Sequence, residues 1–281
     1  MNTARAVLVT GGGSGIGAAV ARTLSGAGSR VAICGRRSGA LRAVAAETGA
    51  LDIACDIANA GQVDQMIGAV TAAFGRLDGL VLNAGIIAPG GIAELSPQDF
   101  EAMVAVNLTG SFLVARAALP HLLASERAAV VSVASVAALR AASGMGGYAA
   151  TKAGLTMLTQ SLAVDHAHEG LRANVVCPGW TITEMADAEM AAFGDERGLG
   201  IADAYRLVTA LVPQRRPASA AEVAAVVGWL LSDAASYVNG AVIPVDGSAV
   251  AVDVGTVPFD ARVIVRQSGE HGGKDDVGQR G

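Results

Sequence analysis

The sequence places two side chains where they can move a proton together. Tyr148 and Lys152 stand at positions i and i+4 of a segment with helical periodicity, so we expect them on one face of a helix. A tyrosine phenol has an ordinary pKa of about 10, which is too high for efficient proton transfer at neutral pH. A nearby ammonium group favours the phenolate, so we expect Lys152 to lower the pKa of Tyr148. Taken alone, the same spacing is also typical of a solvated helical face.

A serine that precedes this pair offers a second hydroxyl group. Ser135 lies just after an apolar run, Ala129–Val133, that we expect to form a buried strand. Its hydroxyl can donate a hydrogen bond to a substrate oxygen and orient that oxygen for Tyr148. The alternative is an ordinary hydroxyl at the end of a strand. A nucleophilic role is disfavoured, because the G-x-S-x-G turn of serine hydrolases is missing around Ser135.

A glycine-rich segment, Thr10–Gly17 (TGGGSGIG), joins the first expected strand to the first expected helix. Glycines permit a tight turn, let the main chain approach a pyrophosphate, and leave N–H groups free at a helix N-terminus. The spacing is T-G-x-x-x-G-x-G rather than G-x-G-x-x-G, and a tight turn without a ligand is the alternative. Its position directly after the first strand of a doubly wound sheet favours nucleotide binding.

Short apolar runs alternate with longer segments of helical periodicity along most of the chain. This alternation is typical of right-handed βαβ units, in which helices cover both faces of one parallel sheet. We therefore predict an α/β fold, a single doubly wound Rossmann-type domain over residues 1–248 with a parallel sheet of about seven strands. The expected strands are Ala6–Thr10, Val31–Cys34, Leu51–Ala54, Leu80–Leu82, Ala129–Val133, Ala173–Val176 and Ala241–Val245.

One region interrupts the alternation inside the predicted domain. Residues 184–217 lack strand character and contain several glycines and prolines, although large apolar side chains occur among them. We expect an inserted, partly helical substrate flap with an apolar underside. Trp180 lines a substrate pocket there or, alternatively, packs under the flap. The residues that we expect to line this pocket are Ile87, Met145, Trp180 and Met185.

The chain continues past the predicted domain as a C-terminal extension, residues 249–281. Its first part, Val250–Val265, has the composition of a further strand. Its last part, Ser268–Gly281, has Val277 as its single large apolar residue, and we expect it to be disordered.

The composition excludes several classes of function. Hydrophobic residues make up 52% of the 281 residues and charged residues 16%, so general disorder is excluded. The net charge of −5 and the lack of a long basic run argue against nucleic-acid binding. Each apolar run ends before the ~18 to 20 residues that a membrane span requires, so we expect no membrane segment. The N-terminus does not resemble a signal peptide, and we expect a cytoplasmic protein.

The cysteines and histidines do not form a recognisable metal site. Cys34, Cys55 and Cys177 are odd in number, lie in apolar stretches and form no C-x-x-C pair. We expect buried structural thiols rather than disulfides or zinc ligands. The four histidines form no H-E-x-x-H motif, so we expect no bound metal.

Several motifs, in this order, resemble those of the short-chain dehydrogenase/reductase family. Thr10–Gly17 matches the family's cofactor turn, and Asn83-Ala84-Gly85, after the fourth expected strand, matches its N-A-G element. Tyr148–Lys152 matches its Y-x-x-x-K element, with Ser135 at the usual separation, and Pro178-Gly179 matches its P-G element. The resemblance covers residues 4 to about 248. It implies hydride transfer between a nicotinamide cofactor and a carbon that bears a hydroxyl or carbonyl group.

The resemblance also implies roles for individual residues. Asn107 resembles the family's fourth catalytic residue, which holds a water that links the lysine to solvent; it is alternatively a helix cap or turn residue. The implied catalytic residues are Asn107, Ser135, Tyr148 and Lys152. The implied cofactor-binding residues are Thr10, Gly11, Gly13, Ser14, Gly15, Ile16, Gly17, Arg36, Arg37, Asp56, Ile57, Asn83, Ala84, Gly85, Tyr148, Lys152, Pro178, Gly179, Thr181 and Thr183. The dipeptide Asp56-Ile57 is alternatively a surface turn, and Thr181 and Thr183 are alternatively caps.

Two arginines bear on the choice between NADP and NAD. A carboxylate that selects NAD normally stands at the end of the second strand, about 20 residues after the glycine-rich turn. Here Val31–Cys34 is followed by Arg36 and Arg37, and no Asp or Glu occurs from Ala18 to Ala46. Guanidinium groups match phosphate oxygens, so NADP is the expected cofactor. The alternative is a solvated arginine pair, and some family members with arginines here use NAD.

We therefore expect an oxidoreductase that transfers hydride between NADP(H) and a secondary alcohol or ketone. The alternative from another class is a non-catalytic nucleotide-binding regulatory or scaffold protein on the same fold. Such proteins usually lack the tyrosine or the lysine, and both are present here. An epimerase or dehydratase usually carries a long substrate domain, but only about 35 residues separate Pro178 from Pro213.

The resemblance implies a homotetramer, since most members of the family form one. The helices that follow Asn107 and that contain Tyr148 are apolar on more than one face. The candidates for packing across subunits are His121, Leu122, Leu155, Leu158 and Leu162, and the alternative is burial inside one subunit.

Overall fold

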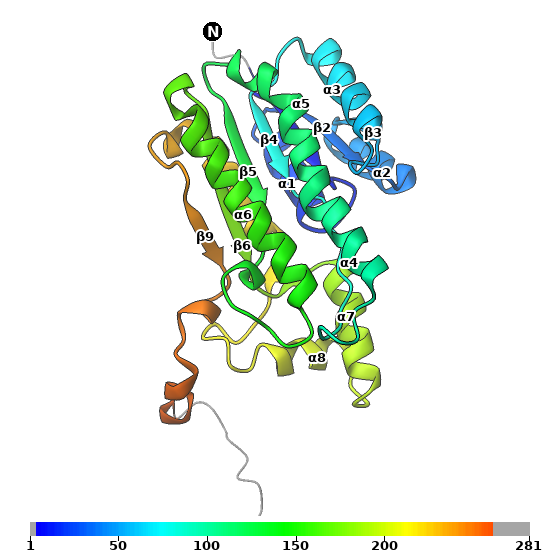
Figure 1. The fold of residues 1–281 in the computed structure, drawn as a ribbon, viewed down its shortest axis with the longest axis vertical. Helices are drawn as coiled ribbons and strands as arrows, with labels where there is room; N and C mark the ends of the chain where they lie inside the picture. Colours follow the sequence, from blue (N-terminus) through cyan, green and yellow to red (C-terminus); the bar gives the residue numbers. More distant parts are fainter. Residues whose placement is uncertain (1–3, 261–281) are drawn as a thin grey trace, which may run out of the picture.

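A parallel sheet of seven strands forms the centre of this computed structural model, which describes residues 4–260 (Figure 1). The strand order is β3-β2-β1-β4-β5-β6-β9. This is the doubly wound Rossmann arrangement, so the predicted fold class is confirmed. The strands are β1 (Ala6–Thr10), β2 (Arg30–Gly35), β3 (Leu51–Ala54), β4 (Gly79–Leu82), β5 (Ala129–Val133), β6 (Arg172–Pro178) and β9 (Val242–Val245).

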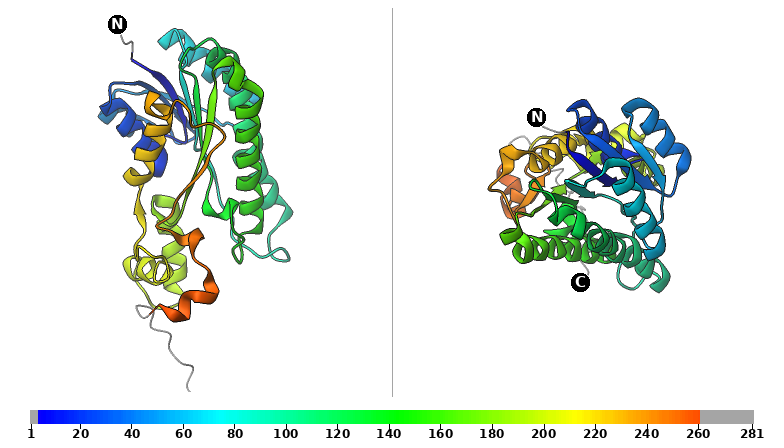
Figure 2. Two further views of the ribbon diagram at one scale, coloured as in Figure 1. Left: turned by 90° about the vertical axis from the view of Figure 1, so that its left-hand side faces the viewer. Right: turned by 90° about the horizontal axis from the view of Figure 1, so that it is seen from above.

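Helices cover both faces of the sheet, as Figure 2 shows. Successive side chains of a strand point to opposite faces, so β1 supplies Val7 and Val9 to one core and Leu8 to the other. Burial on both faces explains why the central strands β1, β4 and β5 are continuous apolar runs, whereas the edge strands β3 and β9 are partly exposed. The first core lies under α1 (Gly15–Gly26), α2 (Ser38–Thr48) and α9 (Ala220–Leu231), and the second under α3 (Ala60–Phe74), α5 (Ser111–Leu123) and α6 (Gly146–His166).

A long helical segment, Pro97–Leu123, runs along the second face. It joins α4 (Pro97–Met103), a π-helical stretch η1 (Val104–Gly110) and α5. Among the described residues it is the one helix long and apolar enough to cross a membrane, which the broken apolar runs of the sequence did not predict. Length and composition alone are weak grounds for a span, because buried core helices share them. Here Val114 and Leu122 pack into the second core.

The expected flap contains two helices, α7 (Glu184–Asp195) and α8 (Ile201–Val208), which lie beyond the carboxyl ends of the strands (Figure 1). A short parallel pair, β7 (Thr181–Ile182) and β8 (Ala218–Ser219), closes its base. Because the two helices pack on each other, the segment has a small apolar core of its own. The buried residues of this core are Ala186, Met190, Ala204 and Tyr205.

Up to residue 260, the extension after β9 does not form the strand that we expected within Val250–Val265. The carboxylate of Asp246 accepts hydrogen bonds from backbone N–H groups two and four residues later (2.9 and 2.8 Å). Together with a left-handed φ of 73° at Ser248, these bonds turn the chain out of the sheet. The chain then forms the short 3-10 helices η5 (Ala249–Ala251) and η6 (Val254–Phe259). Residues 261–281, and with them the expected disorder of Ser268–Gly281, lie outside the described residues.

The three cysteines are free and buried, as expected. Cys34 belongs to β2, Cys177 to β6, and Cys55 follows β3. Burial raises the pKa of Cys55 and of Cys177 to about 11. Neither thiol is ionised near neutral pH, so both act as small apolar side chains.

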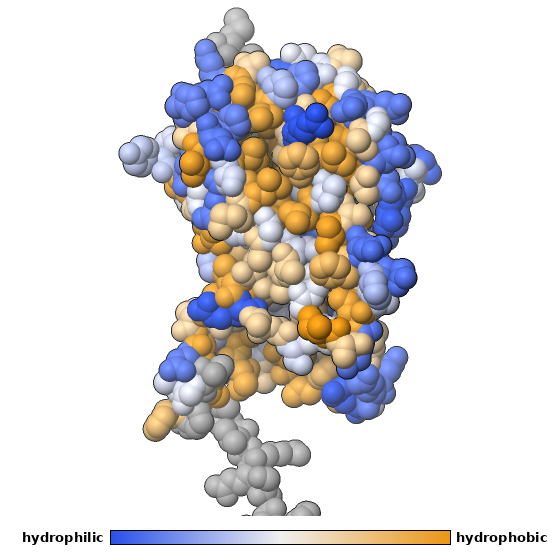
Figure 3. All heavy atoms as spheres, in the orientation of Figure 1, coloured by the Kyte–Doolittle hydropathy of each residue, from blue (hydrophilic) through white to orange (hydrophobic). Residues whose placement is uncertain are grey.

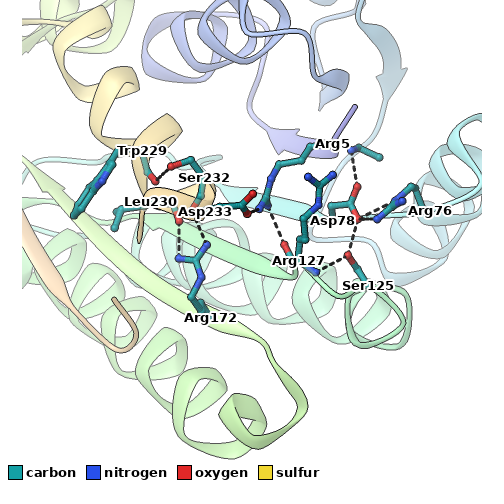
Figure 4. Close-up of polar contacts among 11 residues, drawn as sticks. Arg5, Arg76, Asp78, Ser125, Arg127, Arg172, Trp229, Leu230, Ser232 and Asp233 are labelled. Carbon is teal, nitrogen blue, oxygen red and sulfur yellow. Dashed lines mark hydrogen bonds and ion pairs between the residues drawn. The ribbon is translucent and has the colours of Figure 1, made fainter. Parts of the chain in front are cut away.

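The buried carboxylate of Asp78 connects several elements at the amino edge of the sheet (Figure 4). This edge is opposite the flap. Asp78 has no exposed surface and accepts hydrogen bonds from the Ala6 N–H (2.9 Å), the Ser125 hydroxyl and the Arg76 guanidinium. Burial alone would raise the pKa of Asp78, but these donors outweigh it and hold that pKa below its usual value. Asp78 thus joins the starts of β1 and β4 to the loop before β5.

Replacing Asp78 with alanine should destabilise the fold strongly, because buried donors lose their acceptor. We expect the free energy of unfolding at pH 7 to fall by about 3 kcal/mol, measured by chemical denaturation. Because the native pKa is depressed, the contribution of Asp78 is present above about pH 4 and is lost as the pH falls through the native pKa. Asp64→Ala, on the exposed side of α3, is the control and should stay within about 0.5 kcal/mol of wild type. Equal effects of the two substitutions would contradict this role.

Candidate active site

A cavity of about 980 Å³ opens along the carboxyl ends of the strands and is covered by the flap. Open α/β sheets bind their ligands at this edge, and the volume suits a ligand of dinucleotide size. Of the predicted site residues, Thr10, Gly17 and Asn107 lie behind the wall. The others line the cavity: Gly11, Gly13, Ser14, Gly15, Ile16, Arg36, Arg37, Asp56, Ile57, Asn83, Ala84, Gly85, Ser135, Tyr148, Lys152, Pro178, Gly179, Thr181 and Thr183.

The glycine-rich turn forms one end of the cavity, and Gly11 and Gly17 show most clearly why it needs glycine. Gly11 has a left-handed φ of 67°, which residues with a side chain rarely adopt. A Cβ atom on Gly17 would lie 2.2 Å from the Gly11 carbonyl oxygen, so a side chain there is excluded. The Ser14 side chain makes no capping hydrogen bond to α1. Backbone N–H groups at the start of α1 are therefore available to an anion.

Asn83 joins the ends of β1 and β4, where the strand order reverses. Its Nδ2 donates to the carbonyl oxygens of Thr10 (2.9 Å) and Gly11 (3.2 Å). The Thr10 hydroxyl accepts from the N–H groups of Asn83 (3.0 Å) and Ala84 (3.1 Å) and donates to the Val81 carbonyl oxygen (3.2 Å). The side chains of Thr10 and Asn83 thus hold the glycine-rich turn in position.

Tyr148, Lys152 and Ser135 meet at the other end of the cavity. Tyr148 and Lys152 share one face of α6, with the Lys152 Nζ 5.7 Å from the centroid of the Tyr148 ring. The Ser135 hydroxyl lies close enough to the Tyr148 side chain to lower its pKa, and it accepts a hydrogen bond from the Ala137 N–H (3.1 Å). Lys152 is only 3% exposed, and its ammonium group donates to the Val133 carbonyl oxygen (3.0 Å). Two hydroxyl groups therefore face the cavity with a buried cation beside them.

Burial determines the pKa of both titratable groups. It raises the pKa of Tyr148 to about 12, although the hydrogen bond with Ser135 lowers it, and it lowers the pKa of Lys152 to about 8. The prediction that Lys152 lowers the pKa of Tyr148 is therefore wrong for this structure. The ammonium group is engaged by the Val133 carbonyl oxygen, and the phenol is itself removed from water.

Asn107 lies behind this group, in η1, with no exposed surface. Its Oδ1 accepts from the Ile86 N–H (2.8 Å), and its Nδ2 donates to the Ile86 carbonyl oxygen (2.9 Å) and the Thr151 hydroxyl (3.0 Å). A Cβ on Gly85 would lie 3.2 Å from the Lys152 Nζ and 3.3 Å from the Asn107 Oδ1, so these three residues adjoin. Asn107 is neither a cap nor a turn residue, and π-helical stretches are frequent at functional sites.

The two arginines after β2 lie near the glycine-rich turn. Arg37 donates to the Ser14 hydroxyl (2.7 Å) and pairs with Glu184 at the start of α7 (2.8 Å). Arg36 is exposed and lines the cavity, and no other described residue forms a hydrogen bond or ion pair with its side chain. A ligand at this end of the cavity therefore meets two guanidinium groups.

Asp56 and Thr183 each have a structural role besides lining the cavity. The Asp56 carboxylate accepts a hydrogen bond from the Ala58 N–H (3.0 Å) within a surface turn. The Thr183 hydroxyl accepts from the Ala186 N–H (3.2 Å) and so caps α7. The turn and cap alternatives are confirmed for these two residues, and a role in cofactor binding stays a prediction.

The apolar part of the cavity contains the four residues expected to line a substrate pocket, namely Ile87, Met145, Trp180 and Met185. The sequence analysis missed Glu189, which projects from α7 into the same cavity. Burial raises the pKa of Glu189, and its charge raises the pKa of Tyr148. The signal available in the sequence is an acidic residue four positions after Met185, on the same helical face.

The groups present fit a nicotinamide dinucleotide phosphate. Free N–H groups at the start of α1 suit a pyrophosphate, and guanidinium groups suit a further phosphate. The donors of Lys152 and the hydroxyl of Tyr148, at the far end, suit ribose and a reacting oxygen. No acidic residue at the end of β2 opposes a phosphate there.

Comparisons with known proteins agree with this geometry. A family model described as Enoyl-(Acyl carrier protein) reductase matches residues 11–248. The chain is 42% identical to Protein MoaE of Klebsiella aerogenes over 264 residues, which is 91% of this chain and 99% of that protein. It is 36% identical to Levodione reductase of Leifsonia aquatica over 257 residues, or 89% of this chain and 95% of that protein.

Solved structures extend the likeness to the fold. The crystal structure of levodione reductase matches with a TM-score of 0.85 at 35% identity, covering 89% of this chain and 98% of that one. A variant of actinorhodin polyketide ketoreductase with NADPH matches with a TM-score of 0.84 at 32% identity, covering 88% and 98%. The family match, the relatives and the ordered motifs lead to one conclusion. This chain is an oxidoreductase that belongs to the short-chain dehydrogenase/reductase family.

Proposed function

We propose that the protein transfers hydride between NADP(H) and a secondary alcohol or ketone, as a cytoplasmic enzyme. The observation that carries the proposal is a cavity with two hydroxyl groups and a buried ammonium at one end and two arginines at the other. The levodione reductase and ketoreductase among its relatives act, by their names, on carbonyl compounds, which supports the same reaction type here.

The residues of this chain perform the proton transfer and the orientation of the substrate. The nicotinamide, when bound, supplies or accepts the hydride. In reduction, the Ser135 hydroxyl donates a hydrogen bond to the carbonyl oxygen, and the Tyr148 hydroxyl gives that oxygen its proton. The ammonium group of Lys152, which lies at the same end of the cavity, would hold the ribose next to the nicotinamide through its hydrogen-bond donors. In oxidation the same phenolate removes the proton of the alcohol.

Asn107 acts on this reaction by positioning. Its amide is hydrogen-bonded to Ile86 on one side and to Thr151 on the other. These bonds fix the position of Lys152, next to Thr151, relative to the segment that follows Gly85. The role assigned by the resemblance, which is to hold a water near the lysine, remains part of the proposal.

The preference for NADP follows from charge. An NADP 2′-phosphate carries nearly two negative charges, and Arg36 and Arg37 are the cations next to the turn. Arg37 is already bonded to Ser14 of that turn, so its guanidinium group is held close to where the adenosine ribose would lie. A carboxylate at this position, which selects NAD by binding the ribose hydroxyls, is missing at the end of β2.

We also propose a homotetramer that forms through the outer side of α5 and α6. Figure 3 shows much apolar surface on this face. Phe112, Met157 and Val164 are 45%, 63% and 79% exposed on these helices. Leu122 and Leu155, which were expected to pack across subunits, are buried in the core of one subunit. That part of the expectation is wrong, because helical register turns both side chains toward the sheet.

Changing Tyr148 to phenylalanine removes the proton donor and keeps the ring. We expect kcat to fall by about 10² to 10⁴, the range of general acid–base catalysis, while the affinity for NADPH stays the same. The measurements are ketone reduction followed at the nicotinamide absorbance and direct titration of NADPH. Tyr237→Phe, at a fully exposed tyrosine, is the matched control. Near-wild-type turnover by Tyr148→Phe would refute the mechanism.

The pH profile should report the charge of Lys152. Because the lysine pKa is lowered to about 8, its charge is present below that pH and lost above it. We expect kcat/KM for ketone reduction to be flat below about pH 8 and to fall toward tenfold per pH unit above it. In Lys152→Arg the side chain stays charged, so this fall should move to higher pH. A wild-type profile that is flat to pH 10 would contradict the assignment.

The cofactor preference should disappear when both arginines are removed. In Arg36→Ala/Arg37→Ala we expect the ratio of kcat/KM for NADPH over NADH to fall by roughly 10- to 10³-fold, as expected for lost charge-assisted bonds at a partly exposed site. Arg42→Ala, an exposed arginine on α2 outside the cavity, is the control. A wild-type preference for NADH, or an unchanged ratio in the double variant, would show that the arginines do not select the phosphate.

A further inference from the structure

One carboxylate in the cavity has no partner among residues 4–260. Glu189 lies on the face of α7 that also carries Met185 and Ala186, and all three line the cavity. The other four acidic residues of the lining have partners among the described residues. Asp56 and Asp246 accept backbone N–H groups, and Glu184 and Glu222 pair with arginines. Glu189 forms no hydrogen bond or ion pair with any described residue.

The position of Glu189 relates it to the reacting end of the cavity. Its charge raises the pKa of Tyr148, the proposed proton donor, and of Tyr205 in the flap core. The same cavity is also lined by the apolar side chains of Met145, Trp180 and Met185, and Met185 lies one turn before Glu189 on α7. Glu189 therefore faces the space in which a substrate of Tyr148 must lie.

An unpaired carboxylate that is partly removed from water is unfavourable for the free protein, and burial raises the pKa of Glu189 accordingly. A cation brought by the ligand would restore the lost interaction. An ammonium group does so in a small volume, because it supplies both charge and hydrogen-bond donors. An anionic substrate group would instead be repelled.

We propose that Glu189 is the binding residue for a protonated amino group on the substrate, so that the enzyme acts on amino ketones and the matching amino alcohols. The proposal rests on the proposed function. Hydride adds to the carbonyl carbon and the Tyr148 proton to its oxygen, while the ammonium group remains unchanged and bound to Glu189. The apolar side chains around it would hold the hydrocarbon between the two polar ends.

The test compares three ketones of similar shape at pH 7. They are para-(aminomethyl)acetophenone, para-(hydroxymethyl)acetophenone and para-ethylacetophenone, none of which can cyclise. We expect wild-type kcat/KM to be highest for the ammonium compound. In Glu189→Gln it should fall by about tenfold or more for that ketone, as expected when a hydrogen bond to a charged group is lost, and by less than about twofold for the ethyl ketone. Glu196→Gln, just past the end of α7 and exposed, is the matched control and should change neither value.

The outcomes separate this inference from the proposed function. If kcat/KM falls equally for all three ketones in Glu189→Gln, Glu189 only changes the pKa of Tyr148. If it falls for the hydroxymethyl ketone alone, Glu189 binds a neutral hydrogen-bond donor instead of an ammonium group. Either result overturns the inference. Turnover of the ethyl ketone without preference for the ammonium compound overturns it and leaves the proposed function intact. If no ketone reacts, the proposed function fails. Calorimetric titration of the amino alcohol product into the NADPH complexes of wild type and Glu189→Gln then decides the binding role alone.

Discussion

The burial of one ammonium group is the constraint on which the catalytic end of the molecule depends. Lys152 is held away from water, with the Val133 carbonyl oxygen as its hydrogen-bond acceptor, and its pKa falls to about 8 as a result. A charge in such surroundings is tolerated only where fixed dipoles replace the lost water. Here the Val133 carbonyl group, at the end of β5, accepts from the ammonium group. The position of this charge therefore depends on the packing of α6 against the sheet.

Two asparagine side chains extend this rigidity to the whole cavity. Asn83 binds the glycine-rich turn to the end of β4. Asn107 binds Ile86, which is three residues after Asn83, to Thr151 of α6. The short segment between them is thus held from both ends. Because it links the glycine-rich turn to the helix that carries Tyr148, it fixes the separation between the two ends of the cavity. Neither amide has to touch a ligand to serve this purpose.

The sequence predicted what depends on local pattern and failed where the outcome depends on packing. Continuous apolar runs identified the sheet, because strands buried on both faces have no other composition. The ordered motifs placed Ser135, Tyr148 and Lys152 on one cavity wall, because the carboxyl ends of parallel strands share an edge. The raised pKa of Tyr148 was missed because it reflects burial, to which the charge of Glu189 adds, and the Y-x-x-x-K spacing contains neither.

Other failures have equally specific causes. A single aspartate, Asp246, turns the C-terminal extension away from the sheet in spite of its strand-like composition. The inward direction of Leu122 and Leu155 depends on where each helix contacts the sheet, which apolar periodicity does not specify when more than one face is apolar. Glu189 was overlooked for the same kind of reason. Its position in the cavity depends on how α7 packs, and no sequence motif of the family includes this position.

The flap helix α7 contributes acidic side chains to both ends of the cavity. Glu184, at its start, pairs with Arg37, and Glu189, further along, lines the cavity near Tyr148. Between them Asp187 accepts a hydrogen bond from the Tyr205 hydroxyl (2.9 Å), which joins α7 to α8. An anion bound at Arg37 would compete with Glu184 for that guanidinium, and a cation near Glu189 would meet a carboxylate of the same helix. The two ends of the cavity therefore share α7 as a source of negative charge.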